Sequence, residues 1–182
     1  MDAFEQLVSE VLWREGYWVS TSVKVNLTKA EKVEIGRPSS PRWELDIVAY
    51  SGRENLLRVI ECKSFLDSRG VQANELIDPN NTGTRYKLFR DATLRRVVFN
   101  RLAKQFEESG ACRPNPEIRL GLACGKIGDD RGRVALTQHF AANGWDLFDE
   151  SWLKDRLRAM AADGYENQVS AVVAKLLLRG QN

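Results

Sequence analysis

The sequence has few of the residues on which several classes of catalytic site depend. It contains one histidine, His139, among 182 residues, and serine and cysteine hydrolases need a histidine base beside the nucleophile. The three cysteines, Cys62, Cys112 and Cys124, are odd in number and show no C-x-x-C spacing. They are therefore expected to be reduced thiols without a zinc ion. No glycine-rich phosphate loop ending in Lys-Ser/Thr occurs either, so nothing in the sequence indicates nucleotide hydrolysis.

Long apolar runs are missing as well. No stretch approaches the ~18 apolar residues of a membrane-spanning helix, and the start MDAFEQ lacks the basic region of a signal peptide. These absences predict a cytoplasmic protein with no membrane partner. A length of 182 residues, with 43% hydrophobic residues, predicts a single domain with a core of its own.

Charge of either sign is nearly balanced, with 27 Lys and Arg against 25 Asp and Glu. The chain as a whole is therefore not patterned for a polyanion. The segment from Arg85 to Lys104 is different, because it carries seven Lys or Arg and a single acid, Asp91. Such a local excess is typical of a nucleic-acid contact, and equally of the solvated face of a helix.

The N-terminal part predicts a helix followed by a strand. Asp2 is a candidate N-cap, and apolar residues recur at helical spacing from Phe4 until Gly16 ends the helix. Residues 17–35 are rich in β-branched and aromatic residues, which predicts one strand with an irregular extension. Residues 36–41 form a loop that leads to the most informative part of the chain.

Residues 42–65 predict a β-hairpin with a polar turn at 51–55. If the hairpin closes between positions 53 and 54, residue 46 pairs with residue 61. Asp46, Glu61 and Lys63 then share a face, and alternation puts Leu45, Ile47 and Ala49 on the opposite face of the first strand. Opposed acids are unfavourable unless a cation lies between them, so the cluster predicts a metal site. The alternative is a surface cluster balanced by Lys63 and worth about 0.2–1 kcal/mol per pair.

The remainder predicts alternating helices and strands. The expected elements are a short helix at 71–77, a loop at 78–83, a long helix at 85–108, a buried strand at 118–127, a helix at 134–143 ended by Gly144, a short strand at 145–148, a helix capped by Asp149 or Ser151, and an apolar C-terminal helix. This order predicts an α/β protein with a mixed sheet covered on both faces.

The order helix, three strands, helix, strand, with a gap of fourteen residues between Asp46 and Glu61-Cys62-Lys63, resembles the PD-(D/E)xK nuclease superfamily. The start Phe4-Glu5-x-x-Val8, followed by Glu15-Gly16-Tyr17, is similar to the first helix of Mrr-type endonucleases and archaeal Holliday junction resolvases. The resemblance implies a restriction-endonuclease-like mixed central sheet flanked by helices, with a C-terminal helical extension. Within a single domain of residues 1–182, the core would cover about 4–127 and the extension 128–182.

Two positions depart from the family pattern. Leu45 replaces the proline of the motif, as in many members. The Q-x-x-x-Y element of the exonuclease branch is absent, since Leu76 stands four residues after Gln72. The resemblance therefore favours an endonuclease.

The activity that the resemblance implies is Mg²⁺-dependent hydrolysis of DNA, of the restriction or defence type, with Mn²⁺ as a substitute metal. Asp46, Glu61 and the backbone carbonyl of Cys62 would hold the metal, which prefers hard oxygen ligands. Glu5 would reach the metal through water, although an acid in a first helical turn also simply complements the helix dipole. Lys63 would act on the attacking water, as a general base or by orienting it.

Basic and polar residues near this site are the predicted DNA contacts: Arg42, Ser64, Arg69, Arg85, Lys87, Arg95 and Arg96. No separate recognition domain is visible in the sequence, so specificity would come from loops, from oligomerisation or from a partner protein. The apolar C-terminal helix is the predicted surface for a homodimer or such a partner. Three alternatives stay open: a non-catalytic nucleic-acid-binding or assembly module, a Holliday junction resolvase, and a nuclease subunit of a larger complex.

Overall fold

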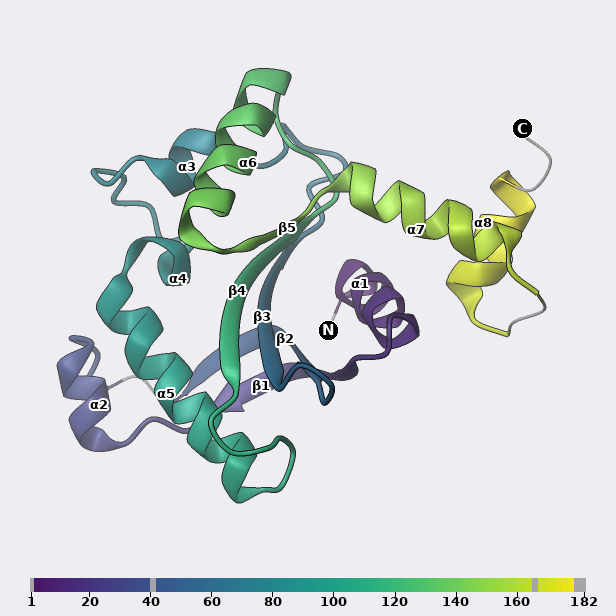
Figure 1. The fold of residues 1–182 in the computed structure, drawn as a ribbon. Coiled ribbons are helices and arrows are strands. Elements are labelled where there is room, and N and C mark those ends of the chain that lie inside the picture. Colours follow the sequence, from purple (N-terminus) through teal and green to yellow (C-terminus); the bar gives the residue numbers. More distant parts are fainter. Residues whose placement is uncertain (1, 40–41, 165–166, 179–182) are drawn as a thin grey trace.

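A mixed sheet of five strands lies at the centre of the computed structural model, which describes residues 2–39, 42–164 and 167–178. The strands are β1 (Trp18–Val25), β2 (Trp43–Ser51), β3 (Leu56–Lys63), β4 (Glu117–Cys124) and β5 (Asp146–Phe148). They are adjacent in sequence order. The first three form an antiparallel meander, and β4 and β5 are parallel to β3 (Figure 1).

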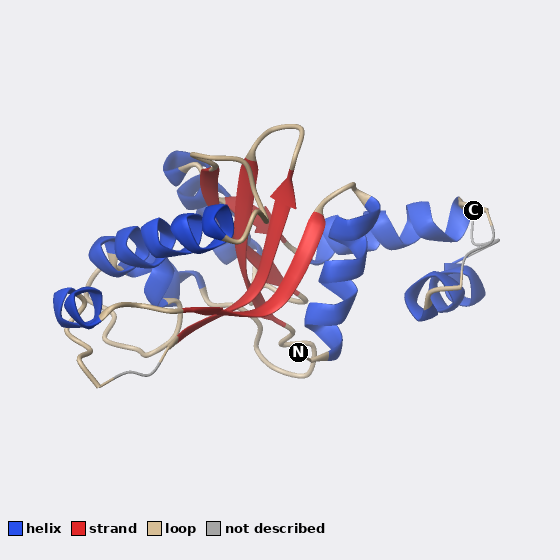
Figure 2. Cartoon of the chain, turned by 90° about the horizontal axis from the view of Figure 1, so that it is seen from below, coloured by secondary structure: helices blue, strands red, loops and turns tan. Residues whose placement is uncertain are grey.

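Helices cover both faces of this sheet (Figure 2). They are α1 (Ala3–Arg14), α2 (Lys29–Glu34), α3 (Ala73–Ile77), α4 (Lys87–Arg90), α5 (Ala92–Glu108), α6 (Asp130–Asn143), α7 (Glu150–Ala162) and α8 (Val169–Leu178). Helices α1 and α7 pack on one face, and α3, α4, α5 and α6 contribute to the core on the other. The predicted α/β class with a mixed sheet flanked by helices is therefore confirmed.

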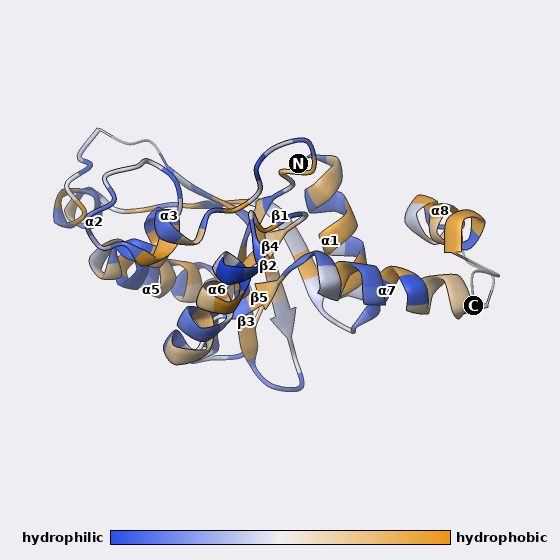
Figure 3. Ribbon diagram, turned by 90° about the horizontal axis from the view of Figure 1, so that it is seen from above, coloured by the Kyte–Doolittle hydropathy of each residue, from blue (hydrophilic) through white to orange (hydrophobic). Residues whose placement is uncertain are grey.

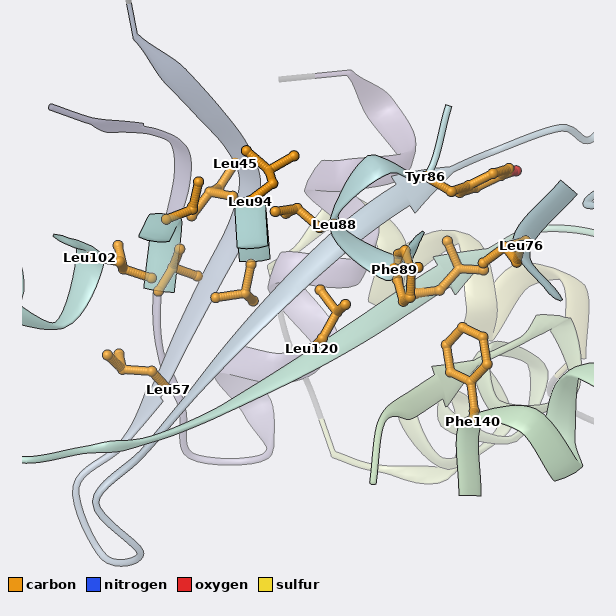
Figure 4. Close-up of a cluster of buried hydrophobic side chains, with 14 of the residues drawn as sticks. Leu45, Leu57, Leu76, Tyr86, Leu88, Phe89, Leu94, Leu102, Leu120 and Phe140 are labelled. Atoms are coloured by element: carbon orange, nitrogen blue, oxygen red, sulfur yellow. The ribbon is translucent and has the colours of Figure 1, made fainter. Parts of the chain in front are cut away.

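The sheet separates two hydrophobic clusters. The larger, called here the α5-side cluster, includes Val48, Val59 and Leu120 from the strands together with buried leucines and phenylalanines of the helices (Figure 4). The smaller, the α1-side cluster, includes Ile47 and Ile60. Because neighbouring residues of a strand point to opposite faces, Ile47 and Val48 serve different clusters.

The predicted hairpin register is confirmed. Ile47 pairs with Ile60 and Val48 with Val59, which is the register that aligns position 46 with position 61. The predicted faces of β2 are wrong at one position, because Leu45 belongs to the α5-side cluster rather than to the α1-side cluster of Ile47. The pairing of β1 with β2 passes over Ser22, which has φ 50°, so the pleat is interrupted opposite Asp46.

Two predicted elements needed correction. The extension expected after the first strand contains a helix, α2, which begins at a reciprocal capping box between Thr28 and Glu31. The expected helix at 85–108 is two helices, α4 and α5. They are separated at Asp91, which is extended (φ −103°, ψ 101°) and caps α5 by accepting a hydrogen bond from the Leu94 N–H. A capping side chain competes with helix continuation, so the chain turns there.

The segment after residue 127 begins with elements that belong to the sheet. Strand β5 pairs with β4, and Leu136 and Phe140 of α6 lie in the α5-side cluster. The predicted end of α6 at Gly144 is confirmed, with φ 66° at this residue. Helix α7 is capped by Asp149, one of the two predicted candidates.

Helix α8 packs against α7, and its Ala171 and Ala174 share a small buried cluster with Val11 of α1. Figure 3 shows the apolar character of α8 in its colours. Five of its apolar residues are exposed: Val169, Val172, Val173, Leu176 and Leu177. This surface is the one predicted to bind a partner, and that role stays a prediction. None of the described helices combines the length and the apolar character that crossing a membrane requires.

A bidentate ion pair ties α2 to α5. The Arg101 guanidinium donates to Glu31 Oε1 from both Nε (3.0 Å) and Nη2 (2.7 Å). Burial alone would raise the pKa of the Glu31 carboxyl, but hydrogen bonds from Arg101 and Thr28 bring the pKa below its ordinary value. A lowered folded-state pKa means stabilisation that is present above the unfolded-state pKa, about 4.3, and lost as the pH falls through the folded-state pKa.

Glu31→Gln is therefore expected to lower the free energy of unfolding at pH 7 by about 1 kcal/mol. The amide preserves the capping box, so the difference reports the charge. That difference should shrink as the pH falls below about 4, as urea unfolding at several pH values would measure. Glu34→Gln is the control, because Glu34 and its partner Arg96 are both exposed, and its expected effect is close to zero. An equal loss in both variants at pH 7 would contradict the assignment.

Candidate metal and phosphate site

The site begins where the ladder between β2 and β3 ends. Ile47 and Ile60 are the last backbone pair of this ladder. Beyond this pair, a carboxylate oxygen of Asp46, in place of a backbone carbonyl of β2, accepts the next hydrogen bond from β3. Asp46 Oδ2 accepts a hydrogen bond from the Cys62 N–H at 2.8 Å. The interruption of β1 at Ser22 lies opposite the same residue. The local break in both ladders thus holds one carboxylate oxygen in the sheet plane.

Asp46, Glu61 and Lys63 line a single pocket of about 280 Å³. Lys63 Nζ lies 3.0 Å from Glu61 Oε1, and both side chains are largely buried. The remaining lining residues come from β2, β3 and the segment before and within α4: Trp43, Glu44, Leu45, Val59, Ile60, Thr84, Arg85, Tyr86, Lys87 and Leu88. The three residues predicted from the hairpin are therefore brought together, and the pocket has a basic opposite wall.

The Glu61 carboxyl has a raised pKa. Burial is the largest cause, and the negative charge of Asp46 acts in the same direction. The ammonium of Lys63 and the backbone N–H of Tyr86 oppose the shift by favouring the ionised form. Two carboxylates that disfavour each other's charge are an unfavourable arrangement by themselves, and a bound cation would relieve it.

Backbone geometry adds a third oxygen. The carbonyl of Lys63 accepts a hydrogen bond from the Gly125 N–H at 3.1 Å, on the β4 side. Because the backbone groups of successive residues point to opposite sides of a strand, the carbonyl of Cys62 points toward β2, beyond the end of the ladder. The close packing on the β4 side depends on glycine, since a Cβ at Gly125 would lie 2.3 Å from the Ser64 carbonyl oxygen.

These oxygens are of the hard type that a magnesium ion prefers. In the described part of the chain, no three His, Cys, Asp or Glu side chains gather in a group that could hold a metal. The fitting set is two carboxylates, of Asp46 and Glu61, with the Cys62 carbonyl. Mg²⁺ keeps several water ligands and is commonly bound through one or two carboxylates, so three protein oxygens suffice.

Glu5 does not line this pocket. It belongs to the first turn of α1, where its Oε2 accepts from the Asp2 N–H at 3.2 Å in a capping box. Helix α1 covers the α1-side cluster, to which Cys62 belongs, whereas Glu61 lies with Tyr86 toward the other face. Burial first, then the charges of Asp46 and Glu5, raise the pKa of the Cys62 thiol. Glu5 is thus near the edge that Asp46 occupies, and its water-mediated role stays a prediction.

The predicted DNA contacts are scattered. Arg85 and Lys87 line the pocket. Arg95 is turned inward, where Nη1 donates to the Leu88 carbonyl at 2.7 Å and the guanidinium covers the Trp145 ring. Arg96 is paired with Glu34. Three further predicted contacts lie outside the pocket, at its strand ends and in the following loop: Arg42, Ser64 and Arg69.

Sequence reasoning missed Tyr86 and Trp43 as residues of the pocket. Tyr86 was expected inside a long helix, but it precedes α4 in a left-handed conformation (φ 57°, ψ 33°). Asp91 was a sequence signal that α5 begins later, since aspartate is a preferred N-cap. No sequence pattern indicated that Trp43 lines the pocket, because its place there depends on how β2 passes α4 in the folded chain.

The arrangement can bind a divalent cation on one wall and an anionic group between that wall and the basic residues of the other. Burial strengthens both interactions relative to the same groups in water. Comparison with protein-family models, curated proteins and solved structures found no match for this chain.

Proposed function

We propose that this protein is a metal-dependent nuclease that hydrolyses DNA phosphodiester bonds, as an endonuclease of the restriction or defence type. The observation that carries the proposal is the single pocket shared by Asp46, Glu61 and Lys63, on neighbouring strands, with Arg85 and Lys87 on its other wall. A phosphodiester is already anionic and gains charge during hydrolysis. A site with cationic groups on both sides of the bound phosphate suits that change.

The finer fold is part of the same proposal. A helix, an antiparallel meander of three strands, further helices and a fourth strand parallel to the third follow one another here. This is the core order of the restriction-endonuclease-like fold, in which the acidic residues lie on the second and third strands. The positions of Asp46 on β2 and Glu61 on β3 support the assignment.

Each residue has a distinct part in the reaction. The carboxylates of Asp46 and Glu61 and the carbonyl of Cys62 would hold Mg²⁺, which supplies Lewis acidity and lowers the pKa of bound water. The Lys63 ammonium would orient the attacking water and stabilise the charge on the phosphoryl oxygens. Arg85 and Lys87 would bind the flanking phosphates. Attack of water on phosphorus breaks the bond to one ester oxygen, which leaves with a proton.

The test is cleavage of supercoiled plasmid, linear duplex and four-way-junction DNA, with RNA in parallel, in Mg²⁺, Mn²⁺ or EDTA. We expect plasmid to be nicked or linearised in either metal and left intact in EDTA. Agarose gels and the salt dependence of binding would measure this, since phosphate contacts weaken steeply with salt. Tight DNA binding without cleavage of any of the substrates would contradict the proposal and favour a non-catalytic binding module.

A second candidate is a nuclease that acts as a dimer or as a subunit, including a junction resolvase. The exposed apolar residues of α8 favour it, because Val169 and Leu176 are 78% and 79% exposed and such patches commonly mark interaction sites. Preference for the four-way junction in the same assay would distinguish a resolvase.

A further inference from the structure

The wall of the pocket opposite the acids is tied together by one guanidinium. Arg90 of α4 donates from Nη1 to the Asn81 carbonyl, and from Nη2 to the carbonyls of Gly83 and Arg85, the last at 2.5 Å. It also donates to Asn81 Oδ1 at 3.1 Å. Charge-assisted hydrogen bonds from a rigid planar fork are stronger and more directional than neutral ones. The loop at 81–85 is therefore held in one shape from α4.

The loop leads into a strained residue. Tyr86 has left-handed backbone angles, which are unfavourable for a residue with a Cβ. Its ring is buried at 1% exposure and meets Phe89 edge-to-face, with centroids 6.4 Å apart (Figure 4). Such a conformation persists only where the surroundings over-determine it. Here the Arg90 contacts fix the chain before Tyr86, and the buried ring fixes the residue itself.

This conformation has consequences for the pocket. Tyr86 lines the same pocket as Glu61, and so do the flanking residues Arg85 and Lys87. A helix that already included residue 82 would instead bond the Tyr86 N–H to the carbonyl of residue 82. The loop geometry therefore sets which backbone and which two cations face the acids across the pocket.

We propose that Arg90 is a positioning residue for the site: by holding the 81–85 loop, it fixes Arg85, Tyr86 and Lys87 on the wall of the pocket that faces Glu61. This inference rests on the proposed nuclease function. It makes the loop a fixed wall of the pocket. Groups that orient a metal ligand typically change metal affinity 10–100-fold when they are removed.

Arg90→Met tests the inference, because methionine keeps much of the aliphatic length and removes every donor. The amide hydrogen exchange of residues 84–88, the dissociation constant for Mn²⁺ alone and the thermal unfolding temperature would be measured. We expect faster exchange in this segment and a Mn²⁺ dissociation constant raised by about tenfold or more. If Arg90→Met does not fold, Arg90→Lys carries the same expectation, since an ammonium cannot span three carbonyls in a plane.

Two controls separate positioning from general destabilisation. Arg96→Met removes an exposed arginine of α5 that pairs with Glu34 and should leave both exchange and Mn²⁺ affinity unchanged. Lys104→Met should do the same, because Lys104 is exposed on α5 and does not line the pocket.

The outcomes test the positioning role of Arg90 separately from the proposed nuclease function. Wild-type protein that binds Mn²⁺, with the same dissociation constant in Arg90→Met or with unchanged exchange at 84–88, would overturn the role of Arg90 alone. Wild-type protein that binds no Mn²⁺ would overturn the proposed function and the inference with it. A raised dissociation constant in Arg90→Met, with both controls unchanged, supports both.

Discussion

Lys63→Met is expected to lower the rate of DNA cleavage by about 10²–10⁴-fold, the range associated with loss of a group that handles the proton or the charge in the transition state. Methionine keeps the aliphatic stem in the pocket wall and removes the ammonium that lies 3.0 Å from Glu61 Oε1. Single-turnover cleavage of plasmid at saturating Mg²⁺ would measure the rate. Binding of the same plasmid should change much less, because Arg85 and Lys87 still line the pocket.

Asp46→Asn is the companion change. Asparagine has the same shape and can still accept the hydrogen bond from the Cys62 N–H, but it lacks the charge that a metal ligand supplies. A comparable loss of cleavage is expected, together with weaker Mn²⁺ binding. The matched control is Lys104→Met, at an exposed position of α5 outside the pocket, which should retain the wild-type rate. Cleavage that persists equally in Lys63→Met and Asp46→Asn would remove the site assignment.

Phe140→Ala is expected to lower the free energy of unfolding by about 3–5 kcal/mol, as large-to-small changes of buried aromatic residues do. The ring is 1% exposed and lies among aromatic neighbours, with centroids 5.3 Å from Phe89 and 5.7 Å from Trp145. Its removal leaves a cavity that those rings can fill only in part. Urea unfolding followed by tryptophan fluorescence would measure the loss.

Val134→Ala is the control on the same helix, because Val134 is 57% exposed and should change stability by less than about 0.5 kcal/mol. The comparison also tests the organisation of the chain. A small effect of Phe140→Ala would mean that α6 is peripheral to the sheet. A large one would show that the segment after residue 127 shares the main core, as the pairing of β5 with β4 indicates.

Local sequence signals predicted much of the fold correctly. The turn at 51–55 and the alternation of β2 and β3 were sufficient for the register of the hairpin, because both depend on residues close in sequence. Helix ends were predicted correctly where a capping residue marks them. Asp2 caps the start of α1, and Gly144 ends α6. Helix α2 was missed although its signal was present, since Thr28-x-x-Glu31 is a capping-box pattern.

The site was predicted in part for the same reason. Asp46, Glu61 and Lys63 came from one hairpin, so local pairing was enough to bring them together. The basic residues came from a predicted long helix that the cap at Asp91 divides. Arg85 and Lys87 therefore reach the pocket, whereas Arg95 turns inward to the Leu88 carbonyl. The helical spacing of these basic residues could not predict which of them face the pocket, because it does not reveal the break between α4 and α5 at Asp91.

By itself, the sequence determined the two strands of the hairpin, their register and the cluster of two acids and a lysine, since these follow from alternation and turn chemistry within about twenty residues. Tertiary structure alone decided three other features. The pleat is interrupted at Asp46, Glu5 lies on the α1 side of the sheet, and Arg90 holds the wall opposite the acids. Each depends on how the chain packs around a residue rather than on the local pattern of its neighbours, and that packing exists only once the sheet and its helices have assembled.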